Sequence, residues 1–357
     1  MRKPKCFTIL GARPQFIKAA PLSKAMSSAG WSEALIHTGQ HYDHEMSAVF
    51  FEELGIPIPR FHLGVAGGSH GEMVGRMLIA LSSLLKEHRP DLVLVYGDTN
   101  STLAGALAAA QLNIPVAHVE AGLRSHRFEM PEEKNRRVTD HLSRLLLCPT
   151  QAAIKQLEIE GITRGVSWVG DLMFDMARDI EEEPSLLPSL DLDQGRYAVM
   201  TLHRAECCDH PDRLQERLAW LSKQSQRAPI IWPIHPRAKV ALERLGECDL
   251  GQIHLIRPLG YRAMATLLKN AAEVFTDSGG VQREAFFHRI PCTTLREESE
   301  WPETIDAGWN RLWRDRESPL PSFEKRGRAE DYFGEERAAP RIMVELNRFA
   351  HSELQLG

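Results

Sequence analysis

The sequence lacks the features that mark several large classes of protein. None of its apolar runs approaches the ~20 residues that a membrane-spanning helix needs, and its net charge of −5 leaves no basic excess for binding nucleic acid. Its six cysteines form no C-x-x-C pair, and the adjacent Cys207 and Cys208 are poorly placed to bridge each other. We therefore expect no membrane partner, no nucleic-acid partner and no zinc site, and a reducing compartment.

Two common nucleotide-binding motifs are also missing. No G-x-G-x-x-G follows the first predicted strand and no G-x-x-x-x-G-K-[ST] occurs, so neither NAD nor a P-loop nucleotide is indicated. The basic N-terminal residues lead directly into a strand-like segment instead of a signal-peptide apolar region, which predicts a cytoplasmic protein. His37, His41 and His44 are not accompanied by a thiolate or an acidic residue at metal-ligand spacing, so we expect no metal.

The 357 residues do contain a regular alternation of short apolar runs with longer amphipathic segments. Such runs predict buried parallel strands, and the segments between them predict helices. The predicted strands are 6–10, 34–37, 92–96, 116–120, 145–148, 166–169, 197–202, 229–234, 253–256, 273–276 and 291–295, with helices at 14–29, 69–88, 99–112 and 150–160. This pattern indicates an α/β protein with two Rossmann-like doubly wound domains and a cleft between them, which ligands enter at the carboxyl ends of the strands.

The expected domain limits follow from a break in the alternation. Residues 182–195 are rich in proline and acidic residues, which predicts a linker. We therefore expect a first domain at 1–182 and a second at 196–337. The apolar tail within 338–357 predicts a helix that packs back on the first domain.

Charged residues gather at the predicted strand ends of the first domain. Arg13 and Lys18 follow the first strand, Asp98 follows the strand at 92–96, and Glu120 ends the strand at 116–120. Glu132 opens the next helix after a proline. Helix capping, or a solvated strand end, would also explain each position. Two cations beside one strand end favour a diphosphate, and clustered carboxylates favour acid–base chemistry.

The second domain repeats this arrangement with different residues. TLHRAE places His203 and Arg204 after its first strand, and PIHPR places His235 after its second. In TDSGGVQREA, the turn of Ser278, Gly279 and Gly280 leads from a strand into a helix. Backbone N–H groups at such a helix start attract phosphate. Glu284, one helical turn further on, can accept both hydroxyls of a ribose. An uncharged turn capped by Asp277 is the structural alternative.

Together, these motifs resemble the non-hydrolysing UDP-N-acetylglucosamine 2-epimerase family. The resemblance runs from about residue 5 to residue 310 and rests on motifs in the same order: GARPQFIK, HTGQHYD, YGDTNSTLAGALAA, HVEAGLRS, MPEEKNR, VGDLMFD, LHRAE, PIHPR, TDSGGVQREA and REESEWPE. The family implies the glycosyltransferase-B architecture. It also implies inversion at C2 of a UDP-2-acetamido sugar, without metal or NAD, by anti elimination of UDP and re-addition.

The resemblance also implies roles for the residues at the matching positions. Asp98, Glu120, Glu132 and His203 correspond to the family's catalytic set, although the motifs do not say which carboxylate removes the C2 proton. The residues that correspond to substrate-binding positions are Arg13, Lys18, Arg204, His235, Ser278, Gly279, Gly280 and Glu284. The implied partner is a UDP-activated 2-acetamido sugar, with no cofactor, and we expect a homodimer.

Some positions depart from the usual family pattern. Trp301 replaces the arginine of a TERPE-like motif, Asp171 replaces an asparagine, and Cys207 replaces another after HRAE. These variants resemble the subgroup that acts on UDP-2,3-diacetamido-2,3-dideoxyglucuronate. Three functions remain open: a non-hydrolysing epimerase, a hydrolysing epimerase that releases free N-acetylmannosamine, and a glycosyltransferase-like UDP-sugar-binding protein. The last is disfavoured because burying three carboxylates is costly unless they have a function.

Overall fold

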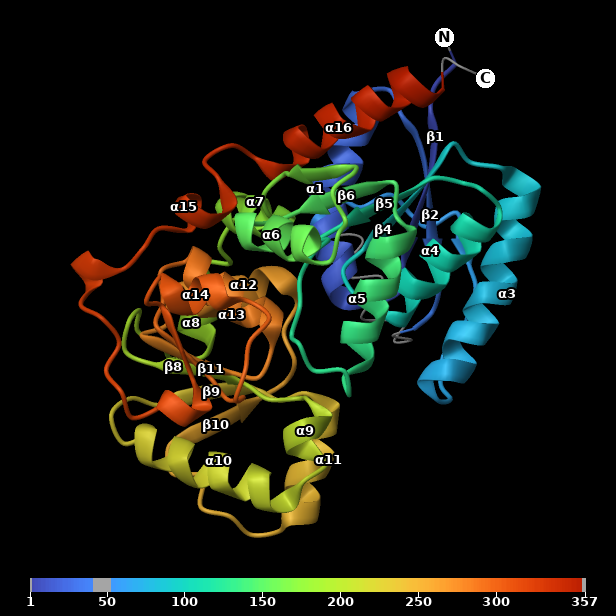
Figure 1. Ribbon diagram of the computed structural model, residues 1–357. Helices are drawn as coiled ribbons and strands as arrows, with labels where there is room; N and C mark the ends of the chain where they lie inside the picture. The colour runs from blue at the N-terminus through green and yellow to red at the C-terminus, as the bar shows by residue number, and fades with distance from the viewer. Residues whose placement is uncertain (1, 41–52, 355–357) are drawn as a thin grey trace. The chain divides into compact units, whose positions relative to one another are not determined.

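The computed structural model describes residues 2–40 and 53–354 and divides the chain into two compact units (Figure 1). Unit 1 comprises residues 1–176 and 332–357, and unit 2 comprises residues 177–331. Each unit contains its own parallel β-sheet and its own hydrophobic core. The chain therefore has the two-domain α/β architecture of the glycosyltransferase-B type that the sequence predicts.

The sheet of unit 1 is parallel throughout, with strand order β3-β2-β1-β4-β5-β6-β7. Its strands are β1 (Lys5–Leu10), β2 (Ser32–His37), β3 (Phe61–His62), β4 (Leu92–Tyr96), β5 (Val116–Val119), β6 (Leu145–Cys148) and β7 (Val166–Trp168). Every residue of β4, LVLVY, is buried, as expected of a central strand covered on both faces. The strand order reverses between β1 and β4, so their carboxyl ends form the switch point at which such sheets bind ligands.

Helices cover both faces of this sheet. They are α1 (Arg13–Ser28), α3 (His70–His88), α4 (Asn100–Gln111), α5 (Pro131–Leu142), α6 (Gln151–Ile159) and α16 (Ala338–Glu353), and α7 (Leu172–Asp179) leads into unit 2. Ser69 and Glu72 form a capping box that starts α3, and Thr99 is the N-cap residue of α4.

The C-terminal helix α16 belongs to unit 1, although its sequence lies far from the rest of that unit. It packs beside α1 (Figure 1), and both helices contribute to one core through residues such as Phe16, Leu346 and Phe349. The Asp175 carboxylate accepts hydrogen bonds from the first two backbone N–H groups of α16, those of Ala338 and Ala339. This side chain therefore satisfies the exposed donors at the helix start.

Unit 2 repeats the doubly wound plan with the parallel order β10-β9-β8-β11-β12-β13. Its strands are β8 (Ala198–Thr201), β9 (Ile230–Pro233), β10 (Ile253–Ile256), β11 (Glu273–Thr276), β12 (Cys292–Thr294) and β13 (Asn310–Leu312). Its helices are α8 (Leu186–Ser189), α9 (Ala205–Cys208), α10 (Pro211–Gln224), α11 (Pro236–Leu245), α12 (Tyr261–Lys269), α13 (Gly279–Phe287) and α14 (Pro302–Asp306). The switch point lies between β8 and β11.

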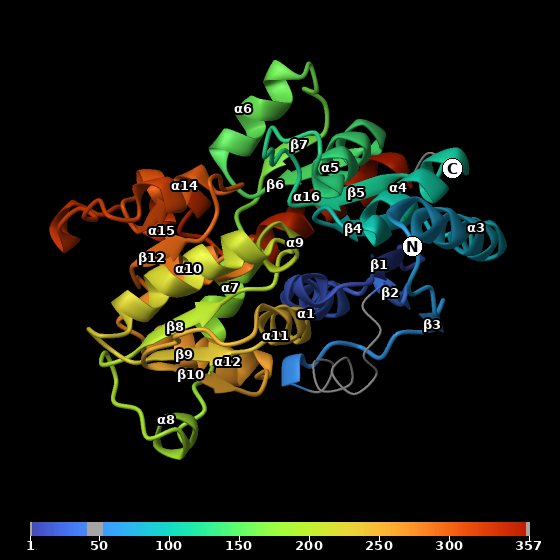
Figure 2. The same ribbon diagram turned by 90° about the horizontal axis from the view of Figure 1, so that it is seen from below.

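Residues 182–195, expected to link the domains, are attached to unit 2. Figure 2 shows this yellow-green segment with the short helix α8 at the periphery of the unit. The Glu183 backbone N–H donates to Thr266 Oγ1 at 2.9 Å, and Leu186 is buried in the core. The unit boundaries fall at 176/177 and 331/332, whereas the sequence places them at 182 and 337.

Residues 313–333 pack mainly against unit 2, and they include residues 314–330, whose role cannot be inferred from the sequence. They form η1 (Trp313–Asp315), η2 (Phe323–Lys325) and α15 (Ala329–Phe333), the last of which leads back to unit 1. Trp309 Nε1 donates to the Gly327 carbonyl at 2.8 Å. The indole of Trp313 packs edge-on against Trp220. This segment therefore has a structural role in closing the core beside β13.

Candidate active site

Three loops meet at the switch point of unit 1, and small or amide side chains connect them. A Cβ atom on Gly11 would lie only 2.1 Å from the hydroxyl oxygens of Thr38 and Ser101, so only glycine fits there. Buried Gln15 accepts hydrogen bonds from the backbone of Gly11 and Ala12 and donates to the Tyr96 carbonyl. These contacts hold the β1 and β4 loops in one arrangement.

A buried ion pair joins two of the residues that the sequence selects. Lys18, on the second turn of α1, contacts Glu120 at the end of β5, and both side chains are less than a tenth exposed. Glu120 has a backbone φ of +72°, a left-handed conformation that is rare outside glycine. A Cβ on Gly97 would lie 3.1 Å from Glu120 Oε2 and 3.6 Å from Lys18 Nζ, so the pair lies directly against the turn after β4.

Asp98, the next residue of that turn, is held by α5. Its carboxylate pairs with Arg136, and its backbone carbonyl accepts a 2.9 Å hydrogen bond from Asn135. The Asp98 side chain keeps 29% of its surface exposed, whereas that of Arg136 keeps 6%. Arg136 therefore orients the Asp98 carboxylate, which is still accessible from solvent.

The neighbouring carboxylates Glu132 and Glu133 have opposite environments. Glu133 is fully buried and accepts hydrogen bonds from the backbone N–H and hydroxyl of Ser125 and from Arg137 Nε. Burial alone would raise the Glu133 pKa, but these donors and the Arg136 charge lower it overall. The Glu132 side chain is half-buried and makes no hydrogen bond or ion pair with residues 2–40 or 53–354. Glu133 therefore anchors the loop, and Glu132 is the carboxylate left available.

In unit 2, His203 follows β8 and is oriented by Asp277, which follows the neighbouring strand β11. Asp277 Oδ2 accepts hydrogen bonds from the backbone N–H groups of His203 and Arg204 at 2.8 and 2.7 Å. The Asp277 Oδ1 atom lies 3.1 Å from His203 Nδ1. Burial would raise the Asp277 pKa, but the His203 ring and these donors lower it. The His203 ring keeps 37% of its surface exposed and can present Nε2 to a ligand.

Arg204 belongs to a network of charges beside the same strand ends. Its guanidinium lies 3.6 Å from Glu300, which also accepts hydrogen bonds from Arg296 Nη1 at 3.0 and 3.1 Å. Glu300 and Arg296 are nearly fully buried, and Arg204 is one quarter exposed. The network fixes the Arg204 guanidinium at the edge of unit 2.

The turn of Ser278, Gly279 and Gly280 starts α13 as the sequence predicts. Ser278 is the N-cap residue, and Gly279 and Gly280 occupy the first turn. A Cβ on Gly280 would meet only Ser278 Oγ, at 3.8 Å, so the helix start is open there. Glu284 is buried one turn later on the same helix. This arrangement leaves backbone N–H groups available to an anion.

Trp301 lies against this turn from the other side. A Cβ on Gly279 would lie 3.5 Å from both Trp301 Nε1 and Glu300 Oε2. The Arg283 guanidinium is centred 3.8 Å over the Trp301 ring, a cation–π contact between two buried side chains. The indole that replaces the expected arginine therefore forms part of the wall beside the glycine turn.

His235 is the N-cap residue of α11, where its Nδ1 accepts a hydrogen bond from the Arg237 backbone N–H. Its ring centroid lies 5.4 Å from that of His203.

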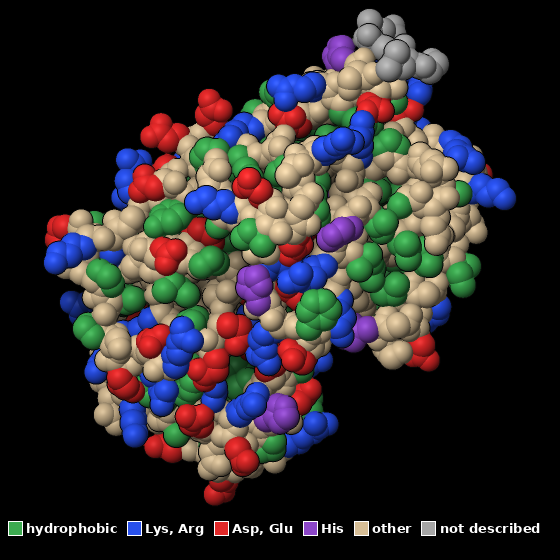
Figure 3. All heavy atoms as spheres, viewed as in Figure 1, with side chains coloured by type: hydrophobic (Ala, Val, Ile, Leu, Met, Phe, Trp, Pro, Cys, Tyr) green, Lys and Arg blue, Asp and Glu red, His purple; other side chains and the backbone are tan. Residues whose placement is uncertain are grey.

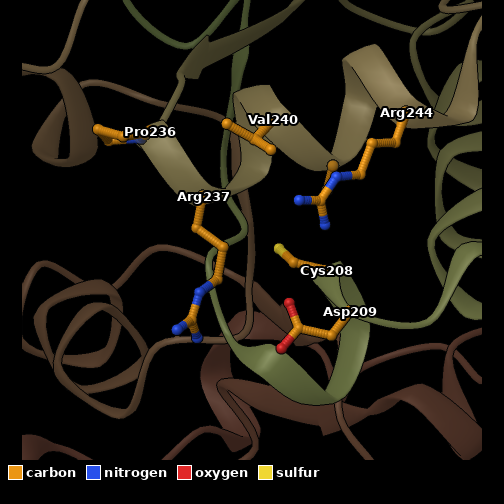
Figure 4. Close-up of a pocket in the computed structure, with 7 residues that line it drawn as sticks. Cys208, Asp209, Pro236, Arg237, Val240 and Arg244 are labelled. Carbon is orange, nitrogen blue, oxygen red and sulfur yellow. The ribbon is translucent and has the colours of Figure 1, made fainter. Parts of the chain in front are cut away.

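Beyond His235, α11 borders a surface pocket of about 350 Å³ (Figure 4). Arg237 and Arg244 extend from α11 on one side of the pocket, and Cys208 and Asp209 lie opposite them. Burial raises the pKa of the Cys208 thiol to about 12, so this thiol is a poor nucleophile.

Metal-binding and membrane-spanning features are absent from the part of the chain that the structure describes. Residues 2–40 and 53–354 contain no group of three or more metal-ligating side chains and no helix that could cross a membrane. His41 and His44, two of the three histidines considered for a metal, lie outside the described residues. All six cysteines are free thiols. On the face shown in Figure 3, acidic and basic side chains are interspersed.

Several side chains at these sites were not selected from the sequence. They are Gln15, His118, Asn135, Arg136, Asp277 as an orienting group, and Arg283. Each lies inside or next to one of the motifs quoted above. Its position in such a motif was the one feature of the sequence that could have drawn attention to it. Their roles depend on partners from distant segments: Gln15 and Tyr96, for example, are 81 positions apart.

Comparisons with known proteins agree with this architecture. Residues 24–346 match the family described as UDP-N-acetylglucosamine 2-epimerase. A UDP-N-acetylglucosamine 2-epimerase homologue of Methanococcus maripaludis is 48% identical over 317 residues, which cover 86% of this chain and 88% of that protein. The UDP-2,3-diacetamido-2,3-dideoxy-D-glucuronate 2-epimerase of Pseudomonas aeruginosa is also 48% identical, over 313 residues and the same shares of both chains.

A solved structure extends the likeness to three dimensions. The crystal structure of Methanocaldococcus jannaschii UDP-GlcNAc 2-epimerase, in complex with UDP-GlcNAc and UDP, superposes with a TM-score of 0.85 at 38% identity. The match covers 96% of this chain and 99% of that one. This chain is therefore a member of the UDP-N-acetylglucosamine 2-epimerase family, whose named relatives are UDP-sugar 2-epimerases.

Proposed function

We propose that this protein inverts C2 of a UDP-2-acetamido sugar without hydrolysing it. A base removes the C2 proton while the C1–O bond breaks. The C2–H electrons form the C1=C2 bond of a 2-acetamidoglycal, and UDP leaves with the C1–O electron pair. A UDP oxygen then attacks C1, and an acid delivers a proton to the opposite face of C2. Atoms and charge balance without an external oxidant or reductant.

The observation that carries this proposal is the buried Lys18–Glu120 pair against the turn that presents Asp98. Because C2 is not acidic, proton removal needs a positioned base and proton return needs a positioned acid. Asp98, Glu120 and Glu132 supply three carboxylates in different environments, which is how one site can hold both an acid and a base. Asp98 and Glu120 each contact a cation, whereas Glu132 contacts none within the described part of the chain.

Unit 2 supports the binding of UDP. The open start of α13 suits the diphosphate, because its N–H groups and dipole favour an anion. In this proposal Arg204 adds a cation, and Glu284, one turn into the same helix, accepts ribose hydroxyls. His203, held by Asp277, is the remaining catalytic group in this proposal. Arg13, in the first turn of α1, adds a cation toward the departing UDP, and His235 contributes to the substrate contacts.

Similarity to the family does not distinguish the hydrolysing from the non-hydrolysing reaction, nor one UDP-sugar substrate from another. We favour the non-hydrolysing reaction over the release of free N-acetylmannosamine, and a diacetamido glucuronate as the preferred substrate. The relative of that name and the resemblance of GARPQF, GDLMFD and EWPE support the substrate choice. We also propose that the protein works in the cytoplasm as a homodimer, and light scattering would test the dimer.

The decisive experiment is proton NMR of turnover in D₂O with the UDP-sugar alone. We expect a product that is still a UDP-sugar and carries deuterium at C2, because the abstracted proton is lost before re-addition. Free sugar and UDP as products would instead show hydrolysis. Full retention of protium at C2 would contradict elimination and addition. Turnover only after addition of an acceptor would show a transferase.

A further inference from the structure

His118 lies on β5, two residues before Glu120, and its side chain is completely buried. Its ring connects two segments of unit 1. Nδ1 lies 2.7 Å from Asp140 Oδ1, on the last turns of α5, and Nε2 lies 2.7 Å from the Gly97 carbonyl oxygen, in the turn after β4. Both ring nitrogens therefore face an oxygen acceptor.

The chemistry of these two oxygens determines where the protons are. A carbonyl oxygen only accepts, so Nε2 must carry a proton. At Nδ1, either the ring donates to a carboxylate, or a protonated Asp140 donates to a neutral ring. Asp140 also faces the Arg124 guanidinium at 2.7 Å and accepts from the Gly122 backbone N–H at 3.2 Å. These donors stabilise an ionised carboxylate, so both protons belong to the ring.

Positive and negative side chains alternate around His118, so the charge of an imidazolium ring would be compensated by its neighbours. Glu160, at the end of α6, accepts two hydrogen bonds from Arg124 and pairs with Arg137 of α5. Lys18 of α1 and Glu120 pair on the other side of the Gly97 turn. From β6, the Cys148 thiol has its pKa raised, first by burial and then by the Asp140 charge.

We propose that His118 is a positioning residue that carries a proton on both ring nitrogens and fixes the Gly97–Asp98 turn for catalysis. Gly97 has a φ of +60°, and a Cβ at this position would lie 3.1 Å from Glu120 Oε2 and 3.6 Å from Lys18 Nζ. A bond to its carbonyl therefore sets the position of Asp98 and of the ion pair together. This role rests on the proposed epimerase function, but the protonation state does not.

Nitrogen NMR of the wild-type protein without substrate, labelled with ¹⁵N-histidine, tests the protonation. We expect one ring with two slowly exchanging N–H signals. Among the described residues only His37 and His118 are buried histidines, and His37 Nδ1 accepts from the Gly39 backbone, so that ring cannot carry both protons. Finding only singly protonated buried rings would overturn the proposal. This readout stands even if the protein has no epimerase activity.

Two matched variants test the positioning role. His118→Asn can keep an N–H toward Asp140 but cannot reach Gly97, whereas His118→Gln can place an N–H near the position of Nε2. We expect the Asn variant to lose at least tenfold in kcat with KM changed less than threefold, and the Gln variant to retain more kcat. Equal losses of kcat in both variants, tracking their losses of stability, would reduce His118 to a packing residue. If neither variant folds, the wild-type spectrum still decides the protonation state.

Discussion

At the scale of single residues, neighbouring side chains of the same type have different tasks. Glu132 and Glu133 are adjacent on α5, yet Glu133 is enclosed by donors from Ser125 and Arg137, and Glu132 is not. His203 and His118 differ in the same way. His203 keeps part of its ring exposed, whereas His118 is enclosed with an acceptor at each nitrogen. The environment, not the residue type, separates candidate catalysts from supports.

Glu132→Gln removes the ability to transfer a proton and leaves the size of the side chain unchanged. We expect turnover to fall roughly a hundredfold or more, the usual contribution of a general acid or base, with stability and UDP affinity unchanged. Glu129→Gln is the matched control, because the Glu129 side chain is 80% exposed and precedes the same helix. Turnover and calorimetric UDP binding would be measured for both. Near-wild-type turnover of Glu132→Gln would remove Glu132 from the catalytic set.

At the scale of elements, strand ends and helix starts supply the functional groups. In both units the switch point of the sheet is where the candidate residues gather: Asp98 follows β4, and His203 follows β8. Parallel strands place their carboxyl ends on one edge, and the following helices point their N-termini to the same edge. The start of α13 and the network between α5 and α6 allow two tests.

Gly280→Val tests the start of α13. The position has room for a side chain and no positive φ, so the variant should fold normally. The added methyl groups would occupy the space in which a phosphate approaches the backbone N–H groups. We expect UDP affinity to fall about tenfold or more, equivalent to ~1.4 kcal/mol. Gly75→Val, on α3 with open space around it, should bind UDP like the wild type in the same calorimetric assay. Unchanged affinity of Gly280→Val would place the diphosphate elsewhere.

The Glu160 ion pairs predict an acid-dependent part of stability. Burial would raise the Glu160 pKa, but the hydrogen bonds and charge of Arg124 lower it from 4.5 to about 2. A depressed folded-state pKa adds stability above the unfolded pKa and loses it as pH falls toward the folded value. In urea denaturation, Glu160→Gln should therefore be less stable than the wild type at pH 7, and this difference should shrink between about pH 4.5 and pH 2. Exposed Glu158→Gln is the control. A difference independent of pH would contradict the ion-pair assignment.

At the scale of the whole molecule, the two units divide the proposed task. Unit 1 carries the carboxylates, and unit 2 carries the helix start proposed to bind the diphosphate, together with Trp301. Trp301 is held by Arg283 and lies against Gly279, so the wall of the proposed nucleotide site differs from one lined by an arginine side chain. An indole in place of an arginine leaves the proposed nucleotide site with one cation fewer. A C6 carboxylate on the sugar would therefore need another cation.

Lys134 and Arg127 are the candidate cations for such a carboxylate. Lys134 is exposed on α5, and Arg127 lies 4.0 Å from Glu129. We expect the wild type to turn over UDP-2,3-diacetamido-2,3-dideoxyglucuronate faster than UDP-N-acetylglucosamine. Lys134→Met should weaken only the first reaction, because only that substrate carries a C6 charge. Exposed Lys155→Met on α6 serves as the control. A clear preference for UDP-N-acetylglucosamine would reverse the substrate assignment and leave the epimerase proposal intact.

The sequence alone predicted the fold class and most of the elements. Interior strands such as β4, β6 and β11 begin and end at the predicted residues. Buried parallel strands need unbroken apolar runs, and those runs can be read directly. Two edge strands, β3 and β13, were not predicted, because two or three residues are too short to show a pattern.

The motifs also placed Lys18, Asp98 and Glu120 at one sheet edge, because chain position fixes which end of a strand a residue occupies. Which partner each side chain meets was decided only by tertiary structure. His118 reaches Gly97 and Asp140, 21 and 22 positions away, and Asp98 meets Arg136, 38 positions away. Such pairs depend on strand order and on the rotation of α5 about its axis. Both are set by packing of the whole core, so no local pattern in the sequence encodes them.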